Sequence, residues 1–277
     1  RIFMRRYLFM VLALCLYRAA PLEAVVIKIT DAQAVLKFAR EKTLVCFNIE
    51  DTVVFPKQMV GQSAWLYNRE LDLKTTLSEE QAREQAFLEW MGISFLVDYE
   101  LVSANLRNVL TGLSLKRSWV LGISQRPVHL IKNTLRILRS FNIDFTSCPA
   151  ICEDGWLSHP TKDTTFDQAM AIEKNILFVG SLKNGQPMDA ALEVLLSGIS
   201  SPPSQIIYVD QDAERLRSIG AFCKKANIYF IGMLYTPAKQ RVESYNPKLT
   251  AIQWSQIRKN LSDEYYESLL SYVKSKG

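Results

Sequence analysis

The sequence predicts an α/β protein built on a doubly wound parallel sheet, with a helical cap insertion after the first strand. Short apolar runs rich in β-branched residues, typical of strands buried on both faces, alternate with segments of helical period. Strands that alternate with helices form a parallel sheet with helices on both faces. The chain has 277 residues, 48% of them hydrophobic, which suits one domain with a sizeable core and an insertion.

The first 24 residues have the pattern of a secretory signal peptide. The basic pair Arg5 and Arg6 precedes an apolar run over residues 7–17, and small residues lead to Ala24. The run is too short to cross a bilayer core of about 30 Å as a lone helix. A buried N-terminal helix is the alternative. We therefore expect residues 1–24 to be a signal peptide, the protein to be exported (periplasmic or secreted), and the mature chain to have no membrane span.

The first half of the remaining chain supplies one core strand and the insertion. A capping-box pattern predicts a helix over residues 30–42. The continuous apolar run at 43–47 predicts a fully buried strand. Residues 55–117 have mostly helical period, with a second capping box at Ser78 and Gln81. We therefore divide the mature chain, residues 25–277, into a core (25–54 and 118–277) and a helical cap (55–117).

The second half repeats the alternation of strand and helix. Residues 146–175 are its least regular stretch, and nothing in them indicates a function. The apolar runs predict strands at 118–123, 143–145, 175–179, 205–209 and 228–234, and the helical periods predict helices at 128–140, 188–196, 213–225 and 255–274, the last capped by Ser262.

Composition and charge exclude several classes of function. The net charge of +5 is small and dispersed, which argues against nucleic acid as a partner. The chain has only two histidines, His129 and His159, so a multi-histidine metal centre is excluded. Cysteines 46 and 223 lie in apolar patterns and are expected to be inert core thiols. Cysteines 148 and 152 flank a proline bend, where a local disulfide and two free thiols are both open.

Polar residues gather where three of the predicted strands end. Asn48 and Glu50 follow the first strand, Ser124 the second, and Asp210 a later one. In an open parallel sheet the carboxyl ends of the strands form the ligand crevice. We therefore expect these residues to meet in one pocket, although they are far apart in the sequence.

Six segments, in this order, carry a family resemblance: TLVCFNIEDTVVFP (43–56), GQSAW (61–65), VLGISQRP (120–127), NILFVGSLKNG (175–185), IIYVDQD (206–212) and YFIGMLY (229–235). Through them the sequence resembles, over residues 31–254, the haloacid dehalogenase-like (HAD) phosphatase superfamily. Within that superfamily it is most similar to bacterial, exported HAD-like proteins related to phosphatases. The resemblance implies a Rossmann-like HAD fold and a two-step phosphoryl transfer that uses Mg²⁺.

The resemblance also implies a role for each matching residue. The superfamily motif after strand one is Asp-x-Asp-x-Thr, whose first Asp attacks phosphorus and whose second acts as acid and base. Asn48 stands at the nucleophile and Glu50 at the acid/base, while Ser124 and Lys183 stand at the phosphate-binding and charge-offsetting positions. The implied substrate-binding residues are Thr52 and Arg126, and the implied Mg²⁺ ligands are Asn48, Glu50 and Asp210.

The departures from the motif decide the functional prediction. A carboxamide carries no full charge, so Asn48 removes the attacking group, and Gln211 stands where an acid often follows Asp210. Both changes remove negative charge from a magnesium shell and predict weak or absent binding. Asp51 is not expected to replace Asn48, because neighbouring residues of a strand face opposite ways.

Three functions remain open at this point. We favour an exported, phosphatase-like protein without turnover that binds a phosphorylated or otherwise anionic ligand, or a protein partner. The second is an active Mg²⁺-dependent phosphomonoesterase, since Glu50, Ser124, Lys183 and Asp210 are retained. The third is a structural or interaction protein of the envelope with a vestigial pocket.

Overall fold

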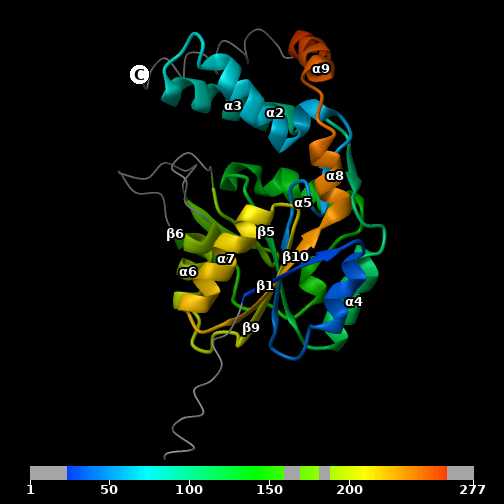
Figure 1. Cartoon of the computed structure of the whole chain (residues 1–277), viewed down its shortest axis with the longest axis vertical. Helices are drawn as coiled ribbons and strands as arrows, with labels where there is room; N and C mark the ends of the chain where they lie inside the picture. Colours follow the sequence, from blue (N-terminus) through cyan, green and yellow to red (C-terminus); the bar gives the residue numbers. More distant parts are fainter. Residues whose placement is uncertain (1–23, 159–168, 181–187, 261–277) are drawn as a thin grey trace, which may run out of the picture.

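The computed structural model describes residues 24–158, 169–180 and 188–260 and contains one central eight-stranded sheet with helices on both faces (Figure 1). Six neighbouring strands of this sheet run parallel, and the last two in the order given next pair antiparallel at one edge. In sheet order they are β1 (Val25–Ile29), β10 (Tyr229–Tyr235), β9 (Gln205–Asp210), β2 (Leu44–Asn48), β5 (Trp119–Ser124), β8 (Ile176–Phe178), β7 (Met170–Glu173) and β6 (Gly155–Ser158).

The sheet separates two hydrophobic cores. Along β2, Val45 and Phe47 face one core and Leu44 and Cys46 the other, because side chains alternate across a strand. The first core is covered by η1 (Ala32–Lys37), α4 (Leu106–Leu115), η3 (Val128–Leu130) and α5 (Ile131–Ser140), and the second by α6 (Met188–Ser197) and α7 (Ala213–Lys225). Central strands buried on both faces account for the continuous apolar runs of the sequence.

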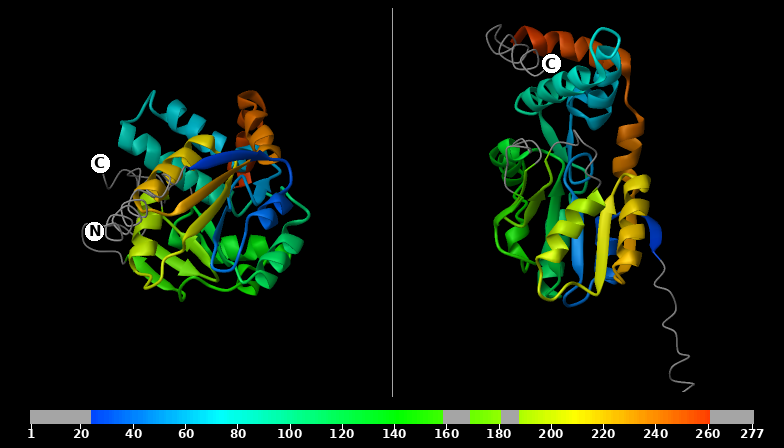
Figure 2. Two further views of the ribbon diagram at one scale, coloured as in Figure 1. Left: turned by 60° about the horizontal axis from the view of Figure 1, so that its bottom comes forward. Right: turned by 90° about the vertical axis from the view of Figure 1, so that its left-hand side faces the viewer.

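The helical insertion stands above the carboxyl end of the sheet (Figures 1 and 2). Strands β3 (Val54–Pro56) and β4 (Tyr99–Leu101) pair antiparallel and form its neck. Beyond the neck lie η2 (Met59–Gly61), α2 (Ser63–Leu73) and α3 (Glu79–Ile93). Helix α4, at the end of the predicted insertion, packs on the sheet through buried residues such as Leu113.

The C-terminal helices lie beside the insertion. After β10 the chain continues into α8 (Thr236–Glu243) and α9 (Pro247–Asn260). The indole rings of Trp254 in α9 and Trp65 in α2 lie 5.3 Å apart between centroids. The helical pair α2–α3 is therefore held both by its neck and by α9.

The predicted α/β class with a mostly parallel sheet is confirmed, as are the strands at 43–47, 118–123, 175–179, 205–209 and 228–234. The strand predicted at 143–145 is wrong. The Asp144 carboxylate accepts a hydrogen bond from the Thr146 amide, and the chain turns there into the 3-10 helix η4 (Phe145–Ser147).

Three further differences concern the edges of the molecule. The helix predicted at 30–42 is the short η1, capped by Asp31 instead of Thr30. Strands β1, β3, β4, β6 and β7 were not predicted, and α9 begins before the predicted residue 255. Residues 1–23 of the expected signal peptide and Ser262 lie outside the described residues. Cys46, Cys148, Cys152 and Cys223 are free thiols, so the alternative of a 148–152 disulfide is not realised.

Candidate functional site

Asn48 is the last residue of β2 and is 1% exposed. Its amide nitrogen donates to the Glu50 carbonyl oxygen at 2.6 Å and to the Thr52 hydroxyl at 3.2 Å. The same hydroxyl accepts a hydrogen bond from the Gln211 backbone amide at 3.3 Å, which connects the turn after β2 to the end of β9. The Asn48 carboxamide oxygen has no hydrogen-bond partner in the described part of the chain.

Glu50 turns its buried carboxylate toward the end of β5. One oxygen accepts from the Ser124 hydroxyl at 2.8 Å, and the other accepts from the Gln125 amide at 2.9 Å. The Arg126 Nε atom lies 3.4 Å from the first oxygen and forms an ion pair with it. The Ser124 hydroxyl also accepts from the Arg126 amide, which fixes this loop.

Arg126 is 1% exposed, which is unusual for an arginine and requires compensation. Its guanidinium donates to the Tyr99 hydroxyl at 2.8 Å and to the Thr134 hydroxyl at 3.3 Å. The Trp90 and Tyr99 rings lie 5.6 and 5.4 Å from its Cζ atom. Arg126 thus joins the sheet to α3 and β4, that is, to the insertion.

Asp210 ends β9 and is fully buried. One of its oxygens accepts from the Asp212 amide at 3.0 Å and the other from Arg215 Nη1 at 2.9 Å. Burial raises the pKa of the Asp210 carboxyl, and the Arg215 guanidinium opposes that rise. In the amide orientation that satisfies both residues, the Gln125 oxygen lies 2.5 and 2.6 Å from the two Arg215 Nη atoms.

Asp51 lies between the sheet and the insertion with a left-handed backbone, φ 57°. Its carboxylate accepts from the Ser63 amide at the start of α2, 3.1 Å away. Burial raises the pKa of this carboxyl from 3.8 to about 6, the Ser63 hydrogen bonds oppose the rise, and the Glu50 charge adds to it. Asp51 therefore points toward the insertion, whereas Asn48 points into its own turn.

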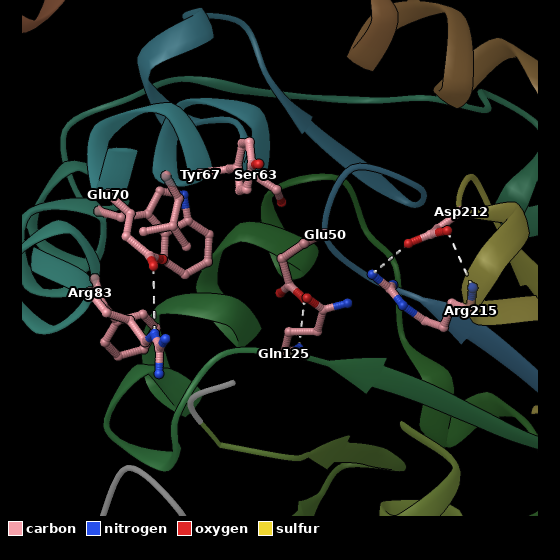
Figure 3. Close-up of a pocket in the computed structure, with 11 residues that line it drawn as sticks. Glu50, Ser63, Tyr67, Glu70, Arg83, Gln125, Asp212 and Arg215 are labelled. Carbon is pink, nitrogen blue, oxygen red and sulfur yellow. Dashed lines mark hydrogen bonds and ion pairs between the residues drawn. The ribbon is translucent and has the colours of Figure 1, made fainter. Parts of the chain in front are cut away.

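A cavity of about 430 Å³ separates the helical pair from the sheet (Figure 3). Glu50, Gln125 and Arg215 face it from the side of the sheet, and an apolar surface faces it from α2 and α3. That surface consists of Leu66, Tyr67, Phe87 and Trp90, flanked by Glu70 and Arg83. The cavity wall is thus polar on the side of the sheet and largely apolar on the side of α2 and α3.

The structure brings most of the predicted site residues together at this crevice. Asn48 is hydrogen-bonded to Glu50 and Thr52 at the end of β2. Ser124 and Arg126 contact the Glu50 carboxylate. Asp210 lies next to Gln211, whose backbone amide donates to Thr52. Lys183 lies outside the described residues. Sequence reasoning missed Arg215, Gln125, Tyr99 and the position of Asp51 at the start of α2. Only Arg215 had a usable signal, because it lies in the first turns of the helix that Asp212 caps.

The side chains expected to hold Mg²⁺ do not fit that role in this arrangement. Both oxygens of Glu50 and both oxygens of Asp210 already accept hydrogen bonds, and Arg126 and Arg215 supply the compensating positive charge. Asn48 offers a neutral oxygen only. Within residues 24–158, 169–180 and 188–260, no group of three or more His, Cys, Asp or Glu side chains is placed to hold a metal ion.

Comparison with known proteins identifies relatives over most of the chain. The profile of a family described as "Protein of unknown function (DUF2608)" matches residues 26–267. A "Putative outer membrane protein" of Chlamydia trachomatis serovar D is 24% identical over 79% of this chain and 78% of its own length. Proteins whose names begin with the same words, from Chlamydia muridarum and Chlamydia pneumoniae, are 23% and 21% identical, over 81% and 85% of each chain.

No solved structure matches the chain at a significant level. In the described ranges we find no helix long and apolar enough to cross a membrane. None of these relatives is named as a HAD protein, and the HAD resemblance stays a prediction.

Proposed function

The chain belongs to the family described as "Protein of unknown function (DUF2608)", and we propose that it is an exported envelope protein whose HAD-like crevice binds a small anionic ligand without hydrolysing it. The binding surface is the cavity between the α2–α3 pair and the carboxyl end of the sheet. Its apolar upper wall and polar floor suit a phosphorylated or carboxylated molecule with an apolar or aromatic part.

The residue at position 48 and the pairing of the neighbouring acids support the proposed loss of turnover. The position expected to attack phosphorus holds a carboxamide, and the neighbouring acids, Glu50 and Asp210, are each paired with an arginine. A neutral amide oxygen is a poor nucleophile, and carboxylates bound to guanidinium groups are poor ligands for a hard cation. We therefore expect neither the nucleophilic attack nor the metal binding that a HAD phosphatase uses.

Two observations support an envelope location. The relatives from three Chlamydia species carry names that begin "Putative outer membrane protein", and the first 24 residues have the pattern of a signal peptide. Expression of the full chain with a C-terminal reporter tests this. Export with removal of the N-terminal segment supports the location, and a reporter retained inside the cell contradicts it.

The catalytic part of the proposal is tested with p-nitrophenyl phosphate and Mg²⁺. We expect the wild-type protein to release no more p-nitrophenol than the Asp210→Ala variant. Asn48→Asp should not gain activity either, because its carboxylate would meet the Glu50 carbonyl oxygen where the amide now donates at 2.6 Å. Turnover that depends on Asp210 would instead show an active phosphomonoesterase.

The binding part is tested by calorimetric titration with phenyl phosphate. Saturable binding that weakens in Phe87→Ala, on the apolar wall of the cavity, is the expected result. The exposed aromatic Tyr229, at the opposite end of the sheet, gives the control Tyr229→Ala. Absence of binding in the wild-type protein contradicts the proposal and favours an envelope interaction protein with a vestigial pocket.

A further inference from the structure

Three consecutive residues, the last of β5 and the two that follow it, direct their donors at one point in the crevice. They are the Ser124 hydroxyl, the Gln125 backbone amide and the Arg126 guanidinium, at 2.8, 2.9 and 3.4 Å from the Glu50 carboxylate. A hydroxyl, a backbone N–H and a guanidinium are the donors that proteins use to bind oxyanions. The group that now fills this position is a carboxylate of the chain itself.

The fit of Glu50 to these donors is incomplete. The Arg126 Nε atom is buried, and no atom of the described residues forms a hydrogen bond with it. Glu50 lies close enough for an ion pair but at 3.4 Å is too distant for a good hydrogen bond. A buried donor without a partner is costly, so an anion with one more oxygen in this place would be favoured over a two-oxygen carboxylate.

Glu50 also lies between the donors and the open space of the crevice. It lines the 430 Å³ cavity, whereas Ser124 is completely buried behind it. Figure 3 shows Glu50 projecting from the sheet side with Gln125 beside it. Displacing this one side chain would connect the cavity with the donors.

We propose that Ser124, the Gln125 amide and Arg126 form an oxyanion-binding site that the Glu50 carboxylate occupies from within the chain. A phosphate or sulfate group binds there by taking the place of Glu50. The inference rests on the proposed role of the crevice as a ligand site, and it specifies phosphate and sulfate groups as the ligands that the site prefers. In the wild-type protein the ligand competes with a tethered anion, so phosphate alone binds weakly.

The test compares inorganic phosphate binding to the full-length wild-type protein and to Glu50→Ala, by calorimetry in a phosphate-free chloride buffer. We expect Glu50→Ala to bind phosphate at least tenfold more tightly than the wild-type protein and to gain thermal stability from it. Adding Ser124→Ala to Glu50→Ala should reverse most of this gain, because the hydroxyl donor is lost. Sulfate should compete with phosphate at the same site.

Two further variants keep the test decisive. Glu50→Ala leaves Arg126 without its carboxylate and can unfold, whereas Glu50→Asp keeps the charge and withdraws it by one C–C bond, about 1.5 Å. Glu50→Asp should also bind phosphate more tightly than the wild-type protein. Glu243→Ala removes an exposed carboxylate of α8 and controls for the charge change.

Specific outcomes would overturn the proposal. Equal phosphate affinity in the wild-type protein, Glu50→Asp and Glu50→Ala would show that Glu50 does not occupy the site. A gain that survives Ser124→Ala, or that Glu243→Ala reproduces, would show that net charge alone is responsible. These results are separate from the phosphatase assay, since turnover in the wild-type protein would refute the proposed function and leave the phosphate comparison intact.

Discussion

The Asp51→Asn substitution should make the protein more stable at neutral pH. Asp51 is 2% exposed, and its carboxylate accepts a hydrogen bond from the Ser63 amide where the insertion begins. An asparagine oxygen can accept the same bond, and asparagine tolerates the left-handed backbone of this position well. The substitution therefore removes a buried charge and keeps the geometry.

The magnitude follows from the pKa of the Asp51 carboxyl, which rises from 3.8 in its ordinary state to about 6 in the folded chain, mainly because of burial. Well below pH 3.8 the group is protonated in both states. As pH rises toward 6, the unfolded chain gives up the proton first, so the folded state is progressively destabilised. The pKa difference of about two corresponds to a loss of about 3 kcal/mol by pH 7.

The assay is urea denaturation of both proteins between pH 4 and 8. The free energies of unfolding should differ by only about 0.5 kcal/mol at pH 4, and Asp51→Asn should exceed wild type by up to about 3 kcal/mol at pH 7.5. Asp144→Asn makes the same chemical change at an exposed turn and serves as the control. If Asp51→Asn is less stable than wild type at pH 7.5, or if the two pH profiles are parallel, the reasoning is refuted.

Three other substitutions test the packing of the crevice and its surroundings. Arg215→Met should cost about 3–5 kcal/mol in urea denaturation, because it leaves the buried Asp210 carboxylate unpaired. The loss should shrink in acid, where Asp210 is protonated. Gly122→Ala should cost about 1–3 kcal/mol, since its new Cβ would lie 3.0 Å from Ile49 in the core. Ser78→Ala should lower stability by about 1 kcal/mol through loss of the α3 capping box, and Ser78→Thr should retain it.

The central strands were predictable from sequence because burial on both faces leaves a local record. Residues 205–209 are apolar without interruption, and they form β9 in the middle of the sheet. The edge strand β1 alternates weakly and is largely exposed, and it directly follows the predicted signal peptide, so its sequence was assigned no structure. The 3-10 helix η4 was missed for a different reason, since one Asp144 hydrogen bond outweighed the apolar Ile143–Phe145 pattern.

The site was predictable to the level of its residue types and no further. The topology of a parallel sheet brings Asn48, Ser124 and Asp210 to one edge, and this follows from the order of strand and helix alone. Hydrogen-bond partners do not follow from it. The Glu50–Arg126 ion pair has no sequence signature, because it depends on side-chain direction across elements far apart in the chain. The Asp210–Arg215 ion pair is local, and the helix capped by Asp212 is its one sequence signal.

The carboxamide at position 48 and the arginines that pair with Glu50 and Asp210 are best understood together. A buried carboxylate without a compensating charge is costly, so Glu50 and Asp210 require cations whether or not a metal binds. Arg126 and Arg215 meet that requirement from within the chain, at 3.4 and 2.9 Å. Restoring an acid at position 48 would add a negative charge to a crevice that is already balanced, without freeing an oxygen for a cation. This charge balance supports the proposed loss of turnover at more than one residue, and it supports the proposal that anions bind by exchange with Glu50.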